Sequence, residues 1–202
     1  MCFTAERSAS LADVVRISAG YPFRGAIDDL DPGPVAVIQM RNVESDSVDW
    51  SSLKRVTLPS KRQPDYLAAG DVIFTTRGRR NSALALRDVQ GLVVCSPHFF
   101  VLRVTEPSYL TPEFLAWQIN QKPAQDYFQQ AATGSYILNI TRAAIEGLAV
   151  TIPAIPLQSH VVALAEAAQH ERQLLNELMD NRQRQLDAIA SQILNPRKAY
   201  SA

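Results

Sequence analysis

Residues 158–194 read QSHVVALAEAAQHERQLLNELMDNRQRQLDAIASQIL, a stretch without glycine or proline that is rich in Ala, Leu, Glu, Gln and Arg. These residue types favour the α-helix, so the stretch predicts one long helix. At 1.5 Å per residue the helix is about 55 Å long, more than a compact domain of this size needs for its own packing. We therefore expect it to project from the rest of the chain.

Apolar side chains recur along the predicted helix in steps of three and four residues, and an arginine interrupts the same seam. This imperfect coiled-coil stripe predicts a dimer or partner contact, in which the polar residue can fix register and partner choice. The alternative is a helix folded back along the main domain, because a helix this long is marginal alone in water. The seam consists of Val161, Ala165, Ala168, Leu175, Met179, Arg182, Leu186, Ile189 and Ile193.

Residues 1–156 differ in composition and contain all eight glycines and eleven of the twelve prolines. Short β-type runs such as 35–38 and 72–76 are bounded by turn residues, and the amphipathic stretches 111–120 and 123–131 favour helices. This part therefore predicts a mixed α/β (α+β) domain.

Two domains follow from this contrast: a mixed α+β domain at 1–156, and a long helix with a short tail at 157–202. No apolar run approaches the length of a membrane span and the N-terminus lacks a signal core, so we expect a cytoplasmic protein without a membrane contact. Cys2 and Cys95 cannot form a disulfide framework or a metal cluster, and Cys95 fits a buried free thiol.

Charge is unevenly distributed in a chain whose net charge is zero. Between residues 51 and 104 there are nine basic and three acidic residues, an excess of six positive charges. A local basic stretch in a neutral protein is typical of a DNA-contacting face, although a solvated surface explains it too. The basic residues are Lys54, Arg55, Lys61, Arg62, Arg77, Arg79, Arg80, Arg87 and Arg103, and the acidic ones are Asp65, Asp71 and Asp88.

Catalytic patterns are missing from the sequence. The three histidines, His98, His160 and His170, are not at metal-ligand spacing, and no glycine-rich phosphate loop occurs. No paired carboxylates lie near a lysine, as metal-assisted hydrolysis of DNA requires. We expect a protein without an active site, metal or cofactor of its own; an enzyme with an unrecognised site is the remaining alternative.

Two segments carry the polar groups that suit DNA. Arginines cluster around Gly78, where an apolar strand launched by the Gly70-Asp71 turn ends, and arginine is the commonest reader of guanine. The segment 133–141, which starts Thr-Gly-Ser, offers hydroxyls and backbone amides to phosphate. Inert surface arginines and a helix-ending glycine explain the two segments equally well.

In their order along the chain, these segments resemble the target recognition domain of a type I restriction-modification specificity subunit. The family also usually has a Pro-x-x-x-Gln segment at the head of the helix, which Pro153 to Gln158 keeps loosely. The resemblance covers nearly the whole chain and is carried by residues 11–14, 20–23, 37–43, 67–78, 112–116, 133–135 and 148–156.

The resemblance implies a domain that reads one half of a split target in double-stranded DNA, and a helix that measures the gap between the halves and docks DNA methyltransferase subunits. Such subunits usually carry two recognition domains and two helices, whereas this chain has one of each. A homodimer through antiparallel helices restores the pair, and pairing with another half-subunit is the alternative. A stand-alone dimeric DNA-binding regulator or decoy is a further reading of the same features.

Carried over by position, the resemblance implies DNA contacts in four parts of the chain. They are the loop after residue 20, the end of the first apolar strand, the arginine cluster and the Thr-Gly-Ser segment. The residues are Tyr21, Arg24, Arg41, Asn42, Arg77, Arg79, Arg80, Ser82, Thr133, Ser135, Tyr136 and Asn139.

Overall fold

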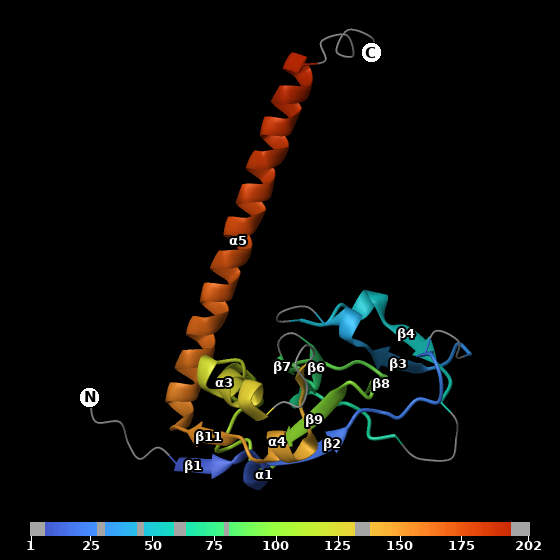
Figure 1. Ribbon diagram of the computed structural model, residues 1–202, viewed down its shortest axis with the longest axis vertical. Coiled ribbons are helices and arrows are strands. Elements are labelled where there is room, and N and C mark those ends of the chain that lie inside the picture. The colour runs from blue at the N-terminus through green and yellow to red at the C-terminus, as the bar shows by residue number, and fades with distance from the viewer. Residues whose placement is uncertain are drawn as a thin grey trace. The chain divides into compact units, whose positions relative to one another are not determined.

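The computed structural model describes residues 7–27, 31–43, 47–58, 64–78, 81–131 and 138–194. The chain divides into two compact units, with the boundary between Ser159 and His160. The first unit combines sheets with short helices, and the second contains most of one long helix (Figure 1). This is the predicted fold class, a mixed sheet and helix domain followed by a long C-terminal helix.

A four-stranded antiparallel sheet with the order β2–β9–β5–β7 is the larger sheet of the first unit. All five residues of β5 are buried, which agrees with its apolar sequence and its place between two neighbours. The strands are β2 (Val15–Ala19), β9 (Phe99–Val104), β5 (Asp71–Thr75) and β7 (Ala83–Ala85).

A three-stranded sheet has the order β4–β3–β8, in which β3 runs parallel to β8 and antiparallel to β4. Its strands are β4 (Lys54–Val56), β3 (Val35–Ile38) and β8 (Leu92–Cys95). All four residues of β3 are buried, because apolar side chains cover both of its faces.

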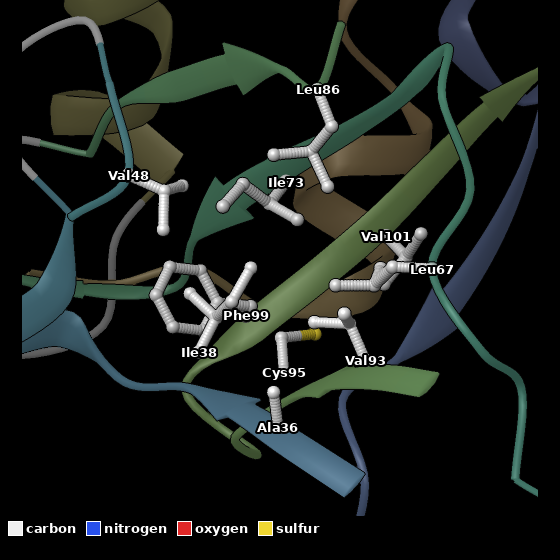
Figure 2. Packing of buried hydrophobic residues seen from close by; sticks show 10 residues of the cluster. All are labelled: Ala36, Ile38, Val48, Leu67, Ile73, Leu86, Val93, Cys95, Phe99 and Val101. Atoms are coloured by element: carbon white, nitrogen blue, oxygen red, sulfur yellow. The ribbon is translucent and has the colours of Figure 1, made fainter. Parts of the chain in front are cut away.

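One hydrophobic core cluster joins the two sheets (Figure 2). Ile38 and Cys95 of the smaller sheet belong to the same cluster as Ile73, Phe99 and Val101 of the larger one. Cys95 is a buried free thiol, as predicted. Burial in this cluster raises the pKa of Cys95 to about 12.

Short elements complete the first unit. Strand β1 (Arg7–Ser10) pairs with β11 (Ala149–Ile152), and helix α1 (Leu11–Val14) leads from β1 into β2. Further short elements are the 3-10 turns η2 (Met40–Asn42) and η3 (Trp50–Ser52) and the helix α4 (Arg142–Glu146).

Helix α2 (Pro112–Ile119) starts as its sequence predicts, because the Thr111 side chain accepts a hydrogen bond from the Phe114 amide and Pro112 lies in the first turn. It is followed by α3 (Lys122–Ala131). The side chain of Asn120, after α2, exchanges two hydrogen bonds of 2.8 and 2.9 Å with the backbone of Ala83. This contact satisfies part of the outer edge of β7.

Helix α5 spans Ile155–Leu194 and has 40 residues. It begins three residues before the predicted stretch, because a proline is tolerated in the first turn of a helix, where Pro156 lies. Gln158, in that turn, is completely buried. Its Oε1 accepts from the Thr111 amide at 2.9 Å, and its Nε2 donates to the carbonyls of Tyr109 and Pro153 at 2.6 and 2.7 Å. Gln158 therefore fixes the first turn of α5 against the loop before α2.

The apolar stripe of α5 is exposed in the single chain from Ala168 onward, whereas Val161 and Ala165 are partly buried. Its large members Leu175, Met179, Leu186, Ile189 and Ile193 are each at least 52% exposed. Leu164, Leu174 and Leu178, which the predicted seam left out, are exposed as well. No helix in the described ranges is long and apolar enough to cross a membrane. The predicted projection of α5 and its coiled-coil pairing stay predictions.

Candidate nucleic-acid interface

Two segments that the sequence singled out separately form one short ribbon. Strand β6 (Arg77–Gly78) pairs antiparallel with β10 (Leu138–Asn139), so that Arg77 lies opposite Asn139 and Gly78 opposite Leu138. The Ile140 amide extends the pairing with a 2.9 Å hydrogen bond to the Thr76 carbonyl. Gly78 has a φ of 146°, a backbone conformation that only glycine adopts easily.

Thr76 connects this β6–β10 ribbon to the turn between β8 and β9. Its amide and its Oγ1 both donate to the carbonyl of His98, at 2.8 and 3.0 Å. Thr76 is 7% exposed, so these hydrogen bonds are shielded from water. One buried threonine therefore holds three segments, around Arg77, Asn139 and His98, in a fixed arrangement.

An open hollow of about 280 Å³ lies where these segments meet. Its polar lining comes from the exposed Arg77 and His98 and from the partly buried Asn139. Among the described residues, no hydrogen bond or ion pair engages the side chain of Arg77 or His98. The rest of the lining comes from Thr76, Pro97, Phe100 and Ile140.

The predicted contact Ser82 has a structural role in the frame of the arginine loop. Its amide donates to Thr75 Oγ1 at 2.7 Å, and its carbonyl accepts from the Thr75 amide at 2.9 Å. Neighbouring Asn81 is buried, and its Nδ2 donates to the Thr75 carbonyl at 2.8 Å. Both residues fix the point where the loop after Gly78 rejoins the sheet.

The predicted contact Asn42 is buried within its own turn. Its Oδ1 accepts from the Gln39 amide at 2.9 Å, and its Nδ2 donates to Ser52 Oγ at 2.9 Å. The amide group is used inside the protein, so we leave Asn42 out of the interface. A polar residue in a predicted loop suggested exposure, whereas here it caps the 3-10 turn. Arg41 beside it is exposed.

Tyr21 and Arg24 follow β2 in a segment that packs on the smaller sheet. Gly20 is required there, because a Cβ atom would lie 2.0 Å from the Ser96 carbonyl oxygen. Tyr21 is partly buried against the second apolar cluster, and its ring meets that of Phe23 edge-on at 4.9 Å. Packing accounts for this tyrosine, while Arg24 is exposed.

Five further predicted contacts lie outside the described residues: Arg79, Arg80, Thr133, Ser135 and Tyr136. Among the predicted contacts in the described ranges, Arg77 and Asn139 are the pair that the structure brings together.

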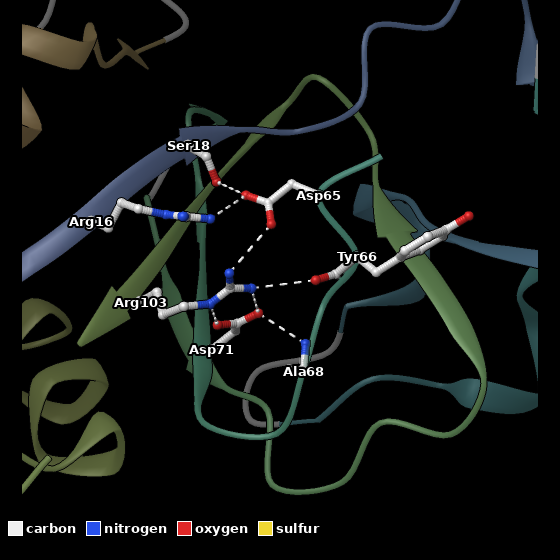
Figure 3. Close-up of polar contacts among 7 residues, drawn as sticks. All are labelled: Arg16, Ser18, Asp65, Tyr66, Ala68, Asp71 and Arg103. Carbon is white, nitrogen blue, oxygen red and sulfur yellow. Dashed lines mark hydrogen bonds and ion pairs between the residues drawn. The ribbon is translucent and has the colours of Figure 1, made fainter. Parts of the chain in front are cut away.

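One arginine of the basic stretch is neutralised internally. Arg103 lies opposite Asp71 in the β5–β9 pairing and binds both carboxylate oxygens, at 2.6 and 2.7 Å (Figure 3). Hydrogen bonds to Asp71 raise the pKa of Arg103 further above its ordinary value. The Ala68 amide also donates to Asp71, at 2.9 Å, and Gly70 has a φ of 88°, which together explain the Gly-Asp sequence of the turn. Arg103 is therefore a structural residue.

Asp65 extends this network at the surface. It accepts from Ser18 at 2.9 Å, from Arg16 at 3.1 Å and from Arg103 at 3.3 Å. Partial burial raises the pKa of Asp65, but the Ser18 hydrogen bond and the charges of Arg103 and Arg16 outweigh it and lower the pKa overall. The network uses up two of the three acidic residues that the basic stretch contains.

His98 and Thr76 were missed by sequence reasoning. A histidine between a proline and a strand gives no local sign of function, and the sequence showed only that His98 is not at metal-ligand spacing. Its place at the hollow depends on a hydrogen-bonded contact between the turn before β9 and Thr76 at the start of β6, which no local pattern predicts. In the described ranges, no group of three or more His, Cys, Asp or Glu residues is placed to hold a metal ion.

Comparisons with known proteins found solved structures with a similar fold. No protein-family model matches the sequence, and no curated protein matches it. The HsdS subunit from Thermoanaerobacter tengcongensis is 18% identical and superposes on 93% of this chain and 48% of its own, with a TM-score of 0.66. The type I restriction-modification S subunit from M. genitalium is 14% identical over 96% of this chain and 47% of its own, with a TM-score of 0.58.

A third solved chain comes from work on complex assembly and conformational transition of the type I restriction-modification system. It is 15% identical over 96% of this chain and 46% of its own, with a TM-score of 0.67. The chain thus spans about half the length of each of these proteins. Its structure resembles a half-length type I restriction-modification specificity subunit, as the order of its sequence motifs predicted.

Proposed function

We propose that this chain is a sequence-specific DNA-binding specificity subunit that directs DNA methyltransferase subunits to a bipartite target in double-stranded DNA. The observation that carries the proposal is the pairing of Arg77 with Asn139 at the end of the β6–β10 ribbon. In this account the protein binds and orients DNA in the cytoplasm. The chemistry and its cofactors, including those of any restriction nuclease, belong to partner subunits.

The β6–β10 ribbon has the chemistry of a major-groove reader. The major groove of B-DNA is wide enough to admit a two-stranded β-ribbon. Arginine binds guanine O6 and N7 with two hydrogen bonds, and asparagine binds adenine N6 and N7 in the same way. Because Arg77 and Asn139 are cross-strand neighbours, we infer that they read adjacent bases.

The predicted contacts outside the described residues are close in sequence to the two strands of the ribbon. Gly78 and Leu138 are register partners, so the links to residues 79–80 and 132–137 start from the same end of the ribbon. Arg79 and Arg80 add positive charge for phosphate, and Thr133, Ser135 and Tyr136 add hydroxyl groups. The exposed Arg24 and Arg41 serve as outlying phosphate contacts in this proposal.

The helix supplies the second half of the assembly. We propose that two copies pair through the stripe on α5, which places two recognition domains in one assembly and gives a target with two-fold symmetry. The exposed leucine, isoleucine and methionine side chains of the stripe favour such burial. Arg182 within the seam then selects the register in which the helices pair.

The mass of the full chain in solution tests the proposed assembly, measured alone and after co-expression with a methyltransferase encoded beside its gene. The expected result is a dimer that captures two methyltransferase subunits. A dimer that binds DNA but ignores the methyltransferase supports a stand-alone regulator instead. A monomer that binds neither DNA nor the methyltransferase would overturn the proposal.

A further inference from the structure

Three chain segments meet at the hollow beside the β6–β10 ribbon, and their side chains divide by chemistry. Arg77, Asn139 and His98 supply polar groups. Phe100 and Ile140 supply apolar surface, with Pro97 next to His98. The hollow therefore combines polar groups from three segments with an apolar lining.

The backbone of His98 is fixed while its side chain is exposed. Its carbonyl accepts the two hydrogen bonds from Thr76, and the following residue, Phe99, is completely buried. The Phe99 amide closes the turn with a 3.2 Å hydrogen bond to the Ser96 carbonyl. The main chain thus holds an imidazole at the hollow, and no hydrogen bond within the described residues uses that ring.

We propose that His98 is a specificity-determining residue, which contacts a base edge beside the bases read by Arg77 and Asn139. The proposal rests on the proposed DNA-binding function and deepens it by adding a third reader to the same site. A neutral imidazole carries one hydrogen-bond donor and one acceptor, and the major-groove edges of the base pairs present both kinds of group.

The lining of the hollow favours a base over a phosphate. Phosphate oxygens only accept hydrogen bonds, so a phosphate at the hollow would engage the charged Arg77 and would gain nothing from Phe100, Pro97 and Ile140. A base edge suits such a lining better, because the thymine methyl group gains from apolar contact. His98 therefore distinguishes bases in this account and does not serve as a phosphate clamp.

Selection from a pool of randomised DNA duplexes tests the role of His98, using the full chain in its native assembly. Three proteins are compared: the wild type, His98→Ala, and His170→Ala as a matched control from the exposed surface of α5. We expect the wild type and His170→Ala to enrich the same motif. In the motif selected by His98→Ala, the base preference at one position should fall by about fivefold or more. The preferences at the neighbouring positions should stay the same. His98→Gln should alter that same preference.

We expect the variants to fold, because the internal hydrogen bonds of His98 use only its backbone carbonyl. Equal melting temperatures of the variants and the wild type verify it. An unchanged motif for His98→Ala overturns the inference and leaves the DNA-binding function intact. So does a uniform loss of affinity on all sequences with a smaller salt dependence, the signature of a phosphate contact. A wild-type chain that enriches no motif overturns the proposed function itself.

Discussion

Arg77 and Asn139 lie directly opposite each other in the β6–β10 ribbon although 62 positions separate them in the sequence. The buried Thr76 keeps this pair beside His98 through hydrogen bonds to the neighbouring segments. A rigid frame with chemically distinct side chains is what sequence recognition requires, because base discrimination depends on fixed donor and acceptor positions.

Changing Arg79 and Arg80 together to alanine should weaken DNA binding on all sequences and flatten its salt dependence. Each phosphate contact contributes about 0.9 to the slope of log K against log salt, so the slope should fall by about 1 to 2. Titrations of labelled duplex at several salt concentrations measure it, with Arg184→Ala on α5 as the control. An unchanged slope would remove these two arginines from the interface.

Leu186→Asp combined with Ile189→Asp should break the dimer or partner contact and leave the first unit folded. Burying two charges in an apolar seam costs more free energy than pairing of the helices contributes. Gln173→Asp with Ser191→Asp introduces the same two charges outside the stripe and should keep the assembly. Solution mass and a thermal melt report the two properties, and a persisting dimer in the seam variant would refute pairing through this stripe.

Gln158→Ala should reduce the free energy of unfolding of the first unit by about 3 kcal/mol. The substitution leaves the Thr111 amide and the carbonyls of Tyr109 and Pro153 without their partner, and an unsatisfied buried group costs about 1 to 3 kcal/mol. Denaturant unfolding measures the loss. Gln183→Ala, on the exposed surface of α5, should change stability by less than about 0.5 kcal/mol. Equal effects of the two variants would contradict the anchoring role of Gln158.

Stability should depend on the Cys95 thiol at alkaline pH. Its folded pKa of about 12 lies above the ordinary value of 9.0, so the unfolded chain loses this proton first. The contribution is fully present below about pH 9 and is lost between 9 and 12, at up to about 1.4 kcal/mol per pH unit. Relative to Cys95→Val, the wild type should therefore lose stability from pH 9 upward. Parallel stability curves for the two proteins would disprove this.

Local patterns predicted the elements that depend on neighbouring residues. The start of α2 follows from Thr111 and Pro112, and the length of α5 follows from its composition. The turn at Asp71 was also recognised, but its partner Arg103 was counted as surface charge because a strand pairing decides that contact.

Long-range pairing explains what the sequence did not predict. Arg77 and Asn139 were proposed separately, and only the β6–β10 register joins them. His98 entered the site through contacts of its backbone with Thr76, which its own side chain does not reveal. Asn42 was predicted to contact DNA but is buried, because capping of a short turn and contact with a ligand require the same polar residue types.

The central claim is that the β6–β10 ribbon reads DNA sequence, and the base preference of the full chain with Arg77→Ala or Asn139→Ala tests it most directly. Selection from randomised duplexes should show that Arg77→Ala loses preference for guanine at one position. Asn139→Ala should lose preference for adenine at the adjacent position, each change amounting to about 1 to 3 kcal/mol of discrimination. Arg184→Ala should leave the motif unchanged. Motifs that survive both ribbon substitutions intact would contradict the claim.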